Sequence, residues 1–461
     1  MGGGGEPKGP TTIFDDDLKK LSNFVGKSNW QTTISFNGGH AKTEEILANS
    51  FKGSRIAGDF IERNFETLIE EMIYKVDNGQ IKAGDQLMVT INTHGAQNRG
   101  ELTHKVALGR STANELTNLD GASTVSLDRL EVLADLAAKK GVKLAVMDFS
   151  CFSGSTLKIK NGNTCVISAS SADLYSYGGK IDFLFFSIAN TFSGKFHGSM
   201  KSGKNLEELF LDARTTGSVP DFPMISTPEA EAIEEKLYRL ISSYLKYNDN
   251  NSNHFHQIYK GDYRDFEEQV CNLDKNFNDV TQFLKQYEKV GYVSDQAMSN
   301  EFAKLREHLE KYRAYQLKYE NTLRQKHLAS IEVDRLLNQN YPSDKKLYSK
   351  YNAIDFLNIN FDDSIKRMQD LESKTNDAYM KSLWKSSVND LVRSKQIANE
   401  MKAKLPAHIT KAFEDAKTAY ANSGVTYDLA SKVSVEAKKV YNELYKSSKT
   451  SNSNPCRDFV L

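Results

Sequence analysis

Two residues able to perform covalent chemistry, Cys151 and His94, each follow a short apolar run. Leu144 to Met147 is typical of a buried strand and leads into a polar turn of small residues that contains Cys151. Gln86 to Ile91 leads into Asn-Thr-His-Gly, with His94 57 residues before the cysteine. A thiol attacks a carbonyl as thiolate, and an imidazole helps to form the thiolate or protonates the leaving amine. The pattern therefore predicts a cysteine nucleophile with a histidine partner.

The segments around these two runs indicate an α/β sandwich. Strand-like and helix-like segments alternate, which predicts a mostly parallel sheet covered by helices on both faces. Such sheets place their chemistry beyond the carboxyl ends of the strands, where both His94 and Cys151 would lie. The further strands are expected at Trp30 to Phe36, Thr103 to Leu108 and Cys165 to Ser168, and the helices at Asp15 to Phe24, Thr43 to Phe51, Ala57 to Val76, Leu127 to Lys140, Phe183 to Phe192 and Asn205 to Arg214.

The composition changes after Pro228: glycine becomes rare, while Lys, Glu, Asn, Tyr and Leu dominate. A heptad-like seam and two long helical stretches, Tyr379 to Leu405 and Thr410 to Tyr445, predict an all-helical, partly coiled-coil-like domain. The expected division is a lead-in at 1–24, the α/β domain at 25–228, the helical domain at 229–450 and a tail at 451–461. The seam consists of Phe302, Leu305, Leu309, Tyr312, Gln316, Tyr319 and Leu323.

Composition and charge exclude several classes of protein. The 461 residues carry 60 basic and 60 acidic side chains, which disfavours a nucleic-acid binder or a polybasic membrane surface. No run approaches the roughly 18 apolar residues of a membrane span. The four cysteines have no CxxC spacing and are too few and scattered for a disulfide framework. Cys165 is interpreted as a small core residue; a bridge to Cys151 is an alternative that would disable the nucleophile.

Three blocks resemble the caspase-like cysteine peptidases, the group that includes caspases, metacaspases, legumains, clostripain and gingipains. Thr93–Gly95 (THG) and Ser150–Ser155 (SCFSGS) resemble the two catalytic blocks of that group. Val166–Tyr177 (VISASSADLYSY) resembles the strand and loop that form one wall of its primary specificity pocket. The likeness covers about residues 25–228, including Asn205 to Arg214 and the DFPMISTP segment after it. It implies a three-layer α/β/α fold and peptidase activity.

The resemblance also assigns residues. His94 and Cys151 correspond to the catalytic dyad, and the amides of Gly95 and Cys151 to the oxyanion hole. Many bacterial members have an acidic residue two positions before the cysteine, where this chain has Phe149. The substrate pocket is expected to use Asp148, Ser170 and Asp173. Two acidic residues there would favour Arg or Lys at P1, whereas Arg55 or Arg99 would favour Asp; of these, the basic P1 residue is the expected preference. Asp148 can also be read as a hydrogen-bonding loop residue.

Other candidate sites carry weaker signals. His254 and His256 flank Phe255 beside an Asn-rich loop and could hold a metal, but the neighbouring acidic residues lack the pattern of an EF-hand. His40 could line the cleft or form a turn. The serines near Cys151 do not form a GxSxG elbow, which disfavours a serine hydrolase. The proposed chemistry requires no cofactor or metal; calcium activation is left open, but no motif indicates it.

The sequence thus predicts a cysteine endopeptidase with a protein or peptide substrate. The main alternative is a catalytically silent scaffold whose helical domain binds a protein partner. The Gly-rich start, MGGGGEPKGP, has no apolar signal core. It fits a native disordered start, a cloning remnant or the tether of a trimmed bacterial lipoprotein, so a cytoplasmic, an envelope and a secreted location all stay open.

Overall fold

The computed structural model describes residues 14–51, 53–96, 104–109, 124–172, 174, 176, 181–183, 186–188, 191–217, 221–230, 241, seven positions between 275 and 285, 296–422, 424–447 and 453–461. The described residues fall into two compact units. Among the described residues, the first unit takes those up to 241, those between 275 and 310 and those from 427 on, and the second takes those between 311 and 426. The first unit therefore combines segments that are separated in the sequence.

A four-stranded sheet in the order β11-β8-β7-β3 forms the centre of the first unit. β3 (Gln86–Ile91), β7 (Lys143–Asp148) and β8 (Thr164–Ser168) are parallel, and β11 (Met224–Ile225) runs antiparallel to β8. The register pairs Ile91 with Asp148, so β3 and β7 end side by side. The prediction of mostly parallel strands whose ends bring two loops together is confirmed.

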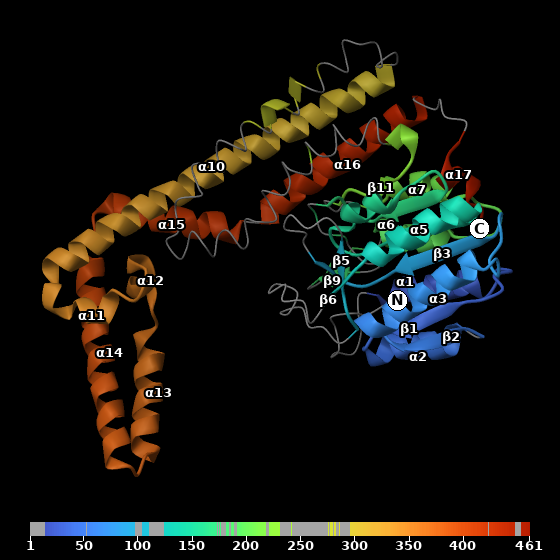
Figure 1. Ribbon diagram of the computed structural model, residues 1–461. Coiled ribbons are helices and arrows are strands. Elements are labelled where there is room, and N and C mark those ends of the chain that lie inside the picture. Colours follow the sequence, from blue (N-terminus) through green and yellow to red (C-terminus); the bar gives the residue numbers. More distant parts are fainter. Residues whose placement is uncertain are drawn as a thin grey trace. The chain divides into compact units, whose positions relative to one another are not determined.

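Helices cover both faces of this sheet (Figure 1). Because side chains alternate along a strand, Leu144 and Val146 of β7 face α3 (Glu62–Asp77) and α5 (Asp128–Lys140) in one core. Cys165 projects from the other face, where α17 (Pro455–Asp458) packs against β8 and α7 (Leu206–Arg214). α5 ends as expected at Gly141, which adopts the left-handed conformation at φ 70°.

Three smaller sheets complete the strands of the first unit. β1 (Ile34–Asn37) pairs in parallel with β2 (Arg55–Asp59). β4 (Gly95–Ala96), β5 (Lys105–Ala107) and β6 (Thr124–Ser126) form an antiparallel ribbon directly after His94. The third sheet is a hairpin of β9 (Ile181–Phe183) and β10 (Phe186–Ile188). The remaining helices here are α1 (Asp15–Val25), α2 (Ala41–Ser50), α6 (Phe192–Ser199) and the 3-10 segment η1 (Ser153–Ile159).

Two helix predictions are wrong in this unit. The expected helix at Phe183 to Phe192 is the β9–β10 hairpin, and α6 begins only at Phe192. A short apolar run rich in aromatic residues suits a strand as well as a helix, so periodicity alone did not separate the two. The helix expected from Ala57 also starts later, at Glu62, because residues 55–59 form β2 and Ile61 is still extended (φ −123°, ψ 158°).

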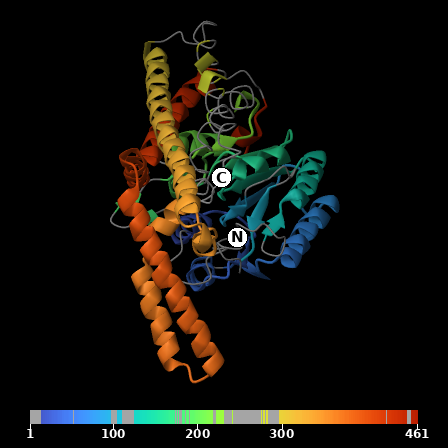
Figure 2. The ribbon, with the colours of Figure 1, turned by 90° about the vertical axis from the view of Figure 1, so that its left-hand side faces the viewer.

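The described residues after 230 are mostly helical, as predicted. α10 (Gln296–Asn340) contains the heptad seam, and all seven seam side chains are buried. α13 (Phe361–Lys374) and α14 (Ala378–Lys404) lie side by side in the second unit (orange, Figures 1 and 2). The other elements are η2 (Pro342–Asp344), α11 (Lys345–Tyr348), α12 (Ala353–Asn358), α15 (Ala407–Ala421) and α16 (Gly424–Ser447).

The linear division at residue 229 does not match the units. Residues 427–447 of α16 and the segment 453–461, expected as helical domain and tail, belong to the first unit. Lys438 of α16 forms an ion pair with Asp221 at 2.6 Å, and both side chains are buried. Tyr445 donates a hydrogen bond to Glu207 of α7 at 2.7 Å. The C-terminal segments therefore complete the α/β unit.

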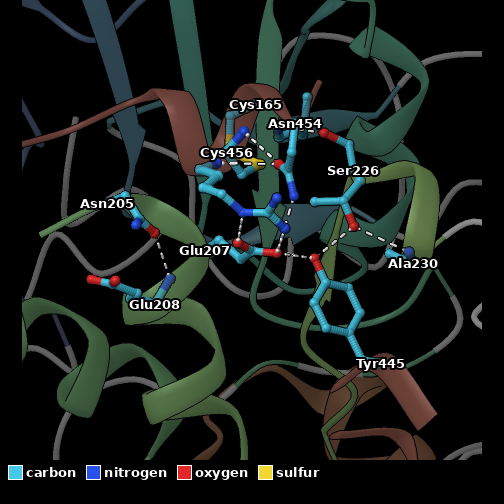
Figure 3. The surroundings of a disulfide bond; sticks show 12 residues. Cys165, Asn205, Glu207, Glu208, Ser226, Ala230, Tyr445, Asn454 and Cys456 are labelled. Atoms are coloured by element: carbon cyan, nitrogen blue, oxygen red, sulfur yellow. Dashed lines mark hydrogen bonds and ion pairs between the residues drawn. A yellow bond between two sulfur atoms is a disulfide. The ribbon is translucent and has the colours of Figure 1, made fainter. Parts of the chain in front are cut away.

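A disulfide between Cys165 and Cys456 corrects the interpretation of the cysteines (Figure 3). The two residues are 291 positions apart, and both side chains are fully buried. Arg457, the residue after Cys456, forms an ion pair with the buried Glu207 at 2.7 Å. Cys165 is thus a core residue with a covalent partner, and Cys151 is not part of a disulfide. Spacing could not reveal a pairing over this separation.

Candidate active site

The turn that holds Cys151 is fixed at both of its ends. The amide of Phe149 extends the β3–β7 ladder by donating to the carbonyl of Ile91 at 2.9 Å. Phe152, directly after the cysteine, adopts the left-handed conformation at φ 59°, and it is the non-glycine residue with positive φ among those described. Such a conformation costs free energy in a bulky residue and persists where surrounding contacts enforce it. Cys151 therefore stands at a sharp, strained turn at the end of β7.

Gly95 brings the second chemical block against this turn. A Cβ added to Gly95 would overlap the carbonyl oxygen of Cys151 and lie 2.9 Å from Ser150 Oγ, so only glycine fits here. The amide of Ala107 donates to the carbonyl of His94 at 2.8 Å. This bond makes His94 and Ala107 a hydrogen-bonded pair of the antiparallel ladder. The next pair, Gly95 and Val106, is therefore a non-hydrogen-bonded pair. The Gly95 N–H therefore points away from β5, as an oxyanion donor requires.

His94 and Cys151 both remain partly exposed. The ring of His94 makes an edge-on contact with Phe14, with 5.3 Å between the ring centroids. Cys151 Sγ lies 3.7 Å from the carbonyl oxygen of Ser176 and 3.8 Å from its hydroxyl. Because the thiol is neither fully buried nor bonded to another cysteine, it is open to reaction.

The segment after β8 runs along the cysteine turn. Leu174 accepts a hydrogen bond from the amide of Phe152 at 3.0 Å. Ser176 donates to the carbonyl of Phe149 at 2.9 Å. A Cβ on Gly154 would overlap the backbone amide of Ala172, which explains the glycine of the SCFSGS block. The sequence pattern found this segment but did not single out Ser176.

Asp148 lies inside the protein, which corrects its expected place in the substrate pocket. Its side chain is fully buried. One carboxylate oxygen accepts from the amide of Ser150 at 2.9 Å and from its hydroxyl at 2.6 Å. The other accepts from the hydroxyl of Thr156 at 2.6 Å. Asp148 therefore holds the cysteine turn from beneath, in agreement with the alternative reading as a loop residue.

The structure places none of the other described candidate residues in a substrate pocket. Ser170 is buried, and its amide donates to Ser153 Oγ at 3.2 Å, so it supports the turn from within. Asp173 and Arg99 lie outside the described residues, as do His254 and His256. Arg55 forms an ion pair with Glu71 at 2.6 Å. His40 caps α2 by accepting from the amide of Lys42, which favours its reading as a turn residue.

Two further histidines lie behind the site, and the sequence analysis did not single them out. His104 Nε2 is 2.9 Å from Ser150 Oγ and 3.6 Å from a carboxylate oxygen of Asp148. Burial lowers the pKa of His104, although the charge of Asp148 opposes the shift. The ring of His197 packs on Phe149 with 4.3 Å between centroids. Its pKa is likewise lowered by burial against the opposing charge of Asp17.

Among the helices that the structure describes, none is long and apolar enough to cross a membrane. Comparison with protein-family models, with curated proteins and with solved structures finds no match to this chain.

Proposed function

We propose that this chain is a cysteine endopeptidase of the caspase-like group. The observation that supports the proposal best is the contact between Gly95 and the Cys151 turn. It joins the two blocks that follow β3 and β7 and leaves the thiol partly exposed. The three-block resemblance of the sequence points to the same chemistry.

In the proposed reaction, the Cys151 thiolate attacks the carbonyl carbon of a substrate peptide bond. The amides of Gly95 and Cys151 stabilise the negative charge that develops on the carbonyl oxygen. His94, protonated when the thiolate forms, gives its proton to the leaving amine. Water then attacks the thioester; the acid is released and the cysteine thiol is regenerated.

The substrate pocket is the less constrained part of the proposal. Asp148 is fully buried, so the acidic candidate left for recognition of Arg or Lys at P1 is Asp173. The Ser176 carbonyl, next to the thiol, would border the bound substrate. We retain a basic P1 residue as the proposed preference, with Asp as the alternative.

Labelling with acyloxymethyl ketones that carry Arg, Lys, Asp or Asn at P1 tests the proposal. We expect covalent modification of Cys151, located by peptide mass spectrometry, and cleavage of matching fluorogenic peptides. Cys151→Ala should abolish both, and His94→Ala should lower kcat on the order of 10²- to 10⁴-fold, the usual contribution of a general acid or base. Cys271→Ala is the matched control for loss of a different cysteine.

A chain that accepts none of these probes and hydrolyses none of these peptides would contradict the proposal and favour the scaffold alternative. Modification at Cys151 without turnover would do the same, because a reactive thiol alone does not make a peptidase.

A further inference from the structure

We infer that His104 is a positioning residue that joins the two chemical blocks; this inference rests on the proposed function. His104 stands directly before β5, which pairs with β4, the strand that contains Gly95. Its side chain reaches the Cys151 turn through Ser150. A single side chain thus connects the ribbon after His94 to the residue that precedes the nucleophile.

The hydrogen bonds around Ser150 fix the direction of this link. The Ser150 hydroxyl is 2.6 Å from Asp148, and a carboxylate can only accept, so the hydroxyl donates there. The contact of 2.9 Å with His104 must then run from the Nε2–H of the imidazole to Ser150 Oγ. Burial lowers the pKa of His104, which favours the neutral ring, and the hydrogen bond to Ser150 places the proton of that ring on Nε2. The chain of donors is His104 to Ser150 to Asp148.

The His104–Ser150 hydrogen bond lies beside the groups that would react, so a small displacement there would change the reaction rate. Ser150 Oγ would lie 2.9 Å from a Cβ added to Gly95, and Cys151 is the next residue. The main chain of His104 is also tied down, because its carbonyl accepts from the amide of Leu127 at 2.9 Å. Loss of the imidazole would remove the donor that joins the ribbon to Ser150, so the ribbon could shift relative to the thiol. Reacting groups displaced by about 1 Å can lose on the order of 100-fold in rate.

Three substitutions separate positioning from general folding. His104→Ala removes the donor. His104→Gln retains an N–H near the place of Nε2, whereas the amide of His104→Asn ends near the place of Nδ1 and is too short to reach Ser150. His40→Gln is the matched control, because His40 is a buried histidine that caps α2 instead.

We expect His104→Ala and His104→Asn to lower kcat roughly 10- to 100-fold with KM nearly unchanged, and His104→Gln to recover most of the loss. His40→Gln should retain the parent kcat. Equal kcat in His104→Ala and the parent, or a Gln variant as slow as the Asn variant, would overturn the inference. Melting temperatures measured in parallel identify variants that fail to fold.

A second readout keeps this inference separate from the proposed function. The rate at which iodoacetamide alkylates Cys151 reports the geometry and ionisation of the thiol without any substrate. Alkylation rates that change in the Ala and Asn variants and return in the Gln variant support the link even if the chain hydrolyses no peptide. Identical rates in all variants would refute it whatever the peptidase assay shows.

The disulfide independently supports a second inference: we infer that this chain matures where protein thiols are oxidised. Disulfides form and persist in secreted, periplasmic and similar compartments and are rare in reducing ones. Cys165 and Cys456 are both fully buried (Figure 3), and Arg457, the residue after Cys456, forms an ion pair with Glu207. Buried in this way, the bond is protected from cellular thiols and belongs to the permanent structure.

Formation of the bond removes one proton and one electron from each thiol. The chemical class of the oxidant is a thiol–disulfide oxidoreductase in its disulfide form. One cysteine attacks the oxidant's disulfide, the second cysteine attacks the mixed disulfide, and the oxidant leaves as a dithiol. Cys151 must escape this reaction in order to remain a nucleophile.

Production of the full chain with and without export to a bacterial periplasm tests this inference. Peptide mapping after alkylation should find Cys165 joined to Cys456 in the exported protein and both cysteines alkylated in the cytosolic one. The exported form should melt roughly 5–15 °C higher, and dithiothreitol or Cys456→Ser should remove the difference. Exported protein with both cysteines alkylated, or equal melting temperatures, would overturn it.

Discussion

Among the described residues, a fully buried Lys–Asp ion pair lies in the first compact unit, whereas the ion pairs of the second unit reach the surface. In the first, Lys438 and Asp221 form an ion pair in which the side chains are 0% and 1% exposed. In the second, pairs such as Lys374–Asp370 and Lys411–Asp415 link successive helical turns and are more than half exposed. Removing one partner of a buried ion pair leaves an uncompensated charge in the interior, whereas exposed ion pairs contribute little to stability. The first unit is therefore the one in which single substitutions should have large effects.

Loss of the buried lysine should have the largest effect. Lys438→Met leaves Asp221 buried without its cation and should lower the free energy of unfolding by about 3–5 kcal/mol. Burial raises the pKa of Asp221 against the opposing charge of Lys438, so the unpaired carboxyl should take up a proton more readily. Urea unfolding measures the change. The double variant Lys438→Met/Asp221→Asn should recover part of it; no recovery would show that the charge is not the cause.

Close packing beside the nucleophile should produce the next largest effect. A Cβ at Gly154 would overlap the backbone of Ala172, which cannot move like a side-chain tip. We expect Gly154→Ala to cost about 1–3 kcal/mol of stability. Gly162→Ala is the control, because nothing lies within 4 Å of a Cβ there and Gly162 has no positive φ. Equal stabilities by thermal unfolding would contradict the close approach.

The pH dependence of stability should report on His104. Its pKa is lowered in the folded protein, so below the ordinary value of 6.5 the unfolded chain binds a proton that the folded chain does not. Stability is thus fully present above pH 6.5 and falls as the pH decreases toward the folded pKa. His104→Gln should reduce this slope by up to about 1.4 kcal/mol per pH unit. Urea titrations between pH 7.5 and 5.5 measure it; an unchanged slope would show that His104 is accessible to protons when folded.

The smallest effect is expected in the second unit. Lys411→Ala removes an exposed pair one turn apart on α15 and should change the free energy of unfolding by less than about 0.5 kcal/mol. A loss comparable to that of Lys438→Met would remove the distinction between the units.

Local patterns predicted the elements that position the candidate site. The apolar runs at Gln86–Ile91 and 144–147 are strands β3 and β7, and the seam of α10 is buried throughout. These signals repeat within a few residues and so can be read from one segment. The expected neighbourhood of His94 and Cys151 followed from the rule that parallel strands end at one edge.

The contacts that the sequence did not reveal join distant segments. Cys165 with Cys456, Asp221 with Lys438 and His104 with Ser150 are pairs that no local spacing encodes. Asp148 also illustrates this limit, because its sequence position suggested a contact with substrate that its burial rules out. Its position near the nucleophile suggested a pocket residue, but whether a carboxylate faces substrate or interior depends on packing that brings Thr156 beneath it.

The separation of 291 residues between the bridged cysteines has a consequence for synthesis. At about 5–20 residues per second, roughly 15–60 s pass after Cys165 is made before Cys456 exists. During that interval Cys151, only 14 positions away, and later Cys271 are the thiols with which Cys165 could be crosslinked. Early oxidation to Cys151 would trap a chain without a free thiol at that position, so the order in which thiols emerge and meet their oxidant would decide how much of the protein matures with Cys151 intact.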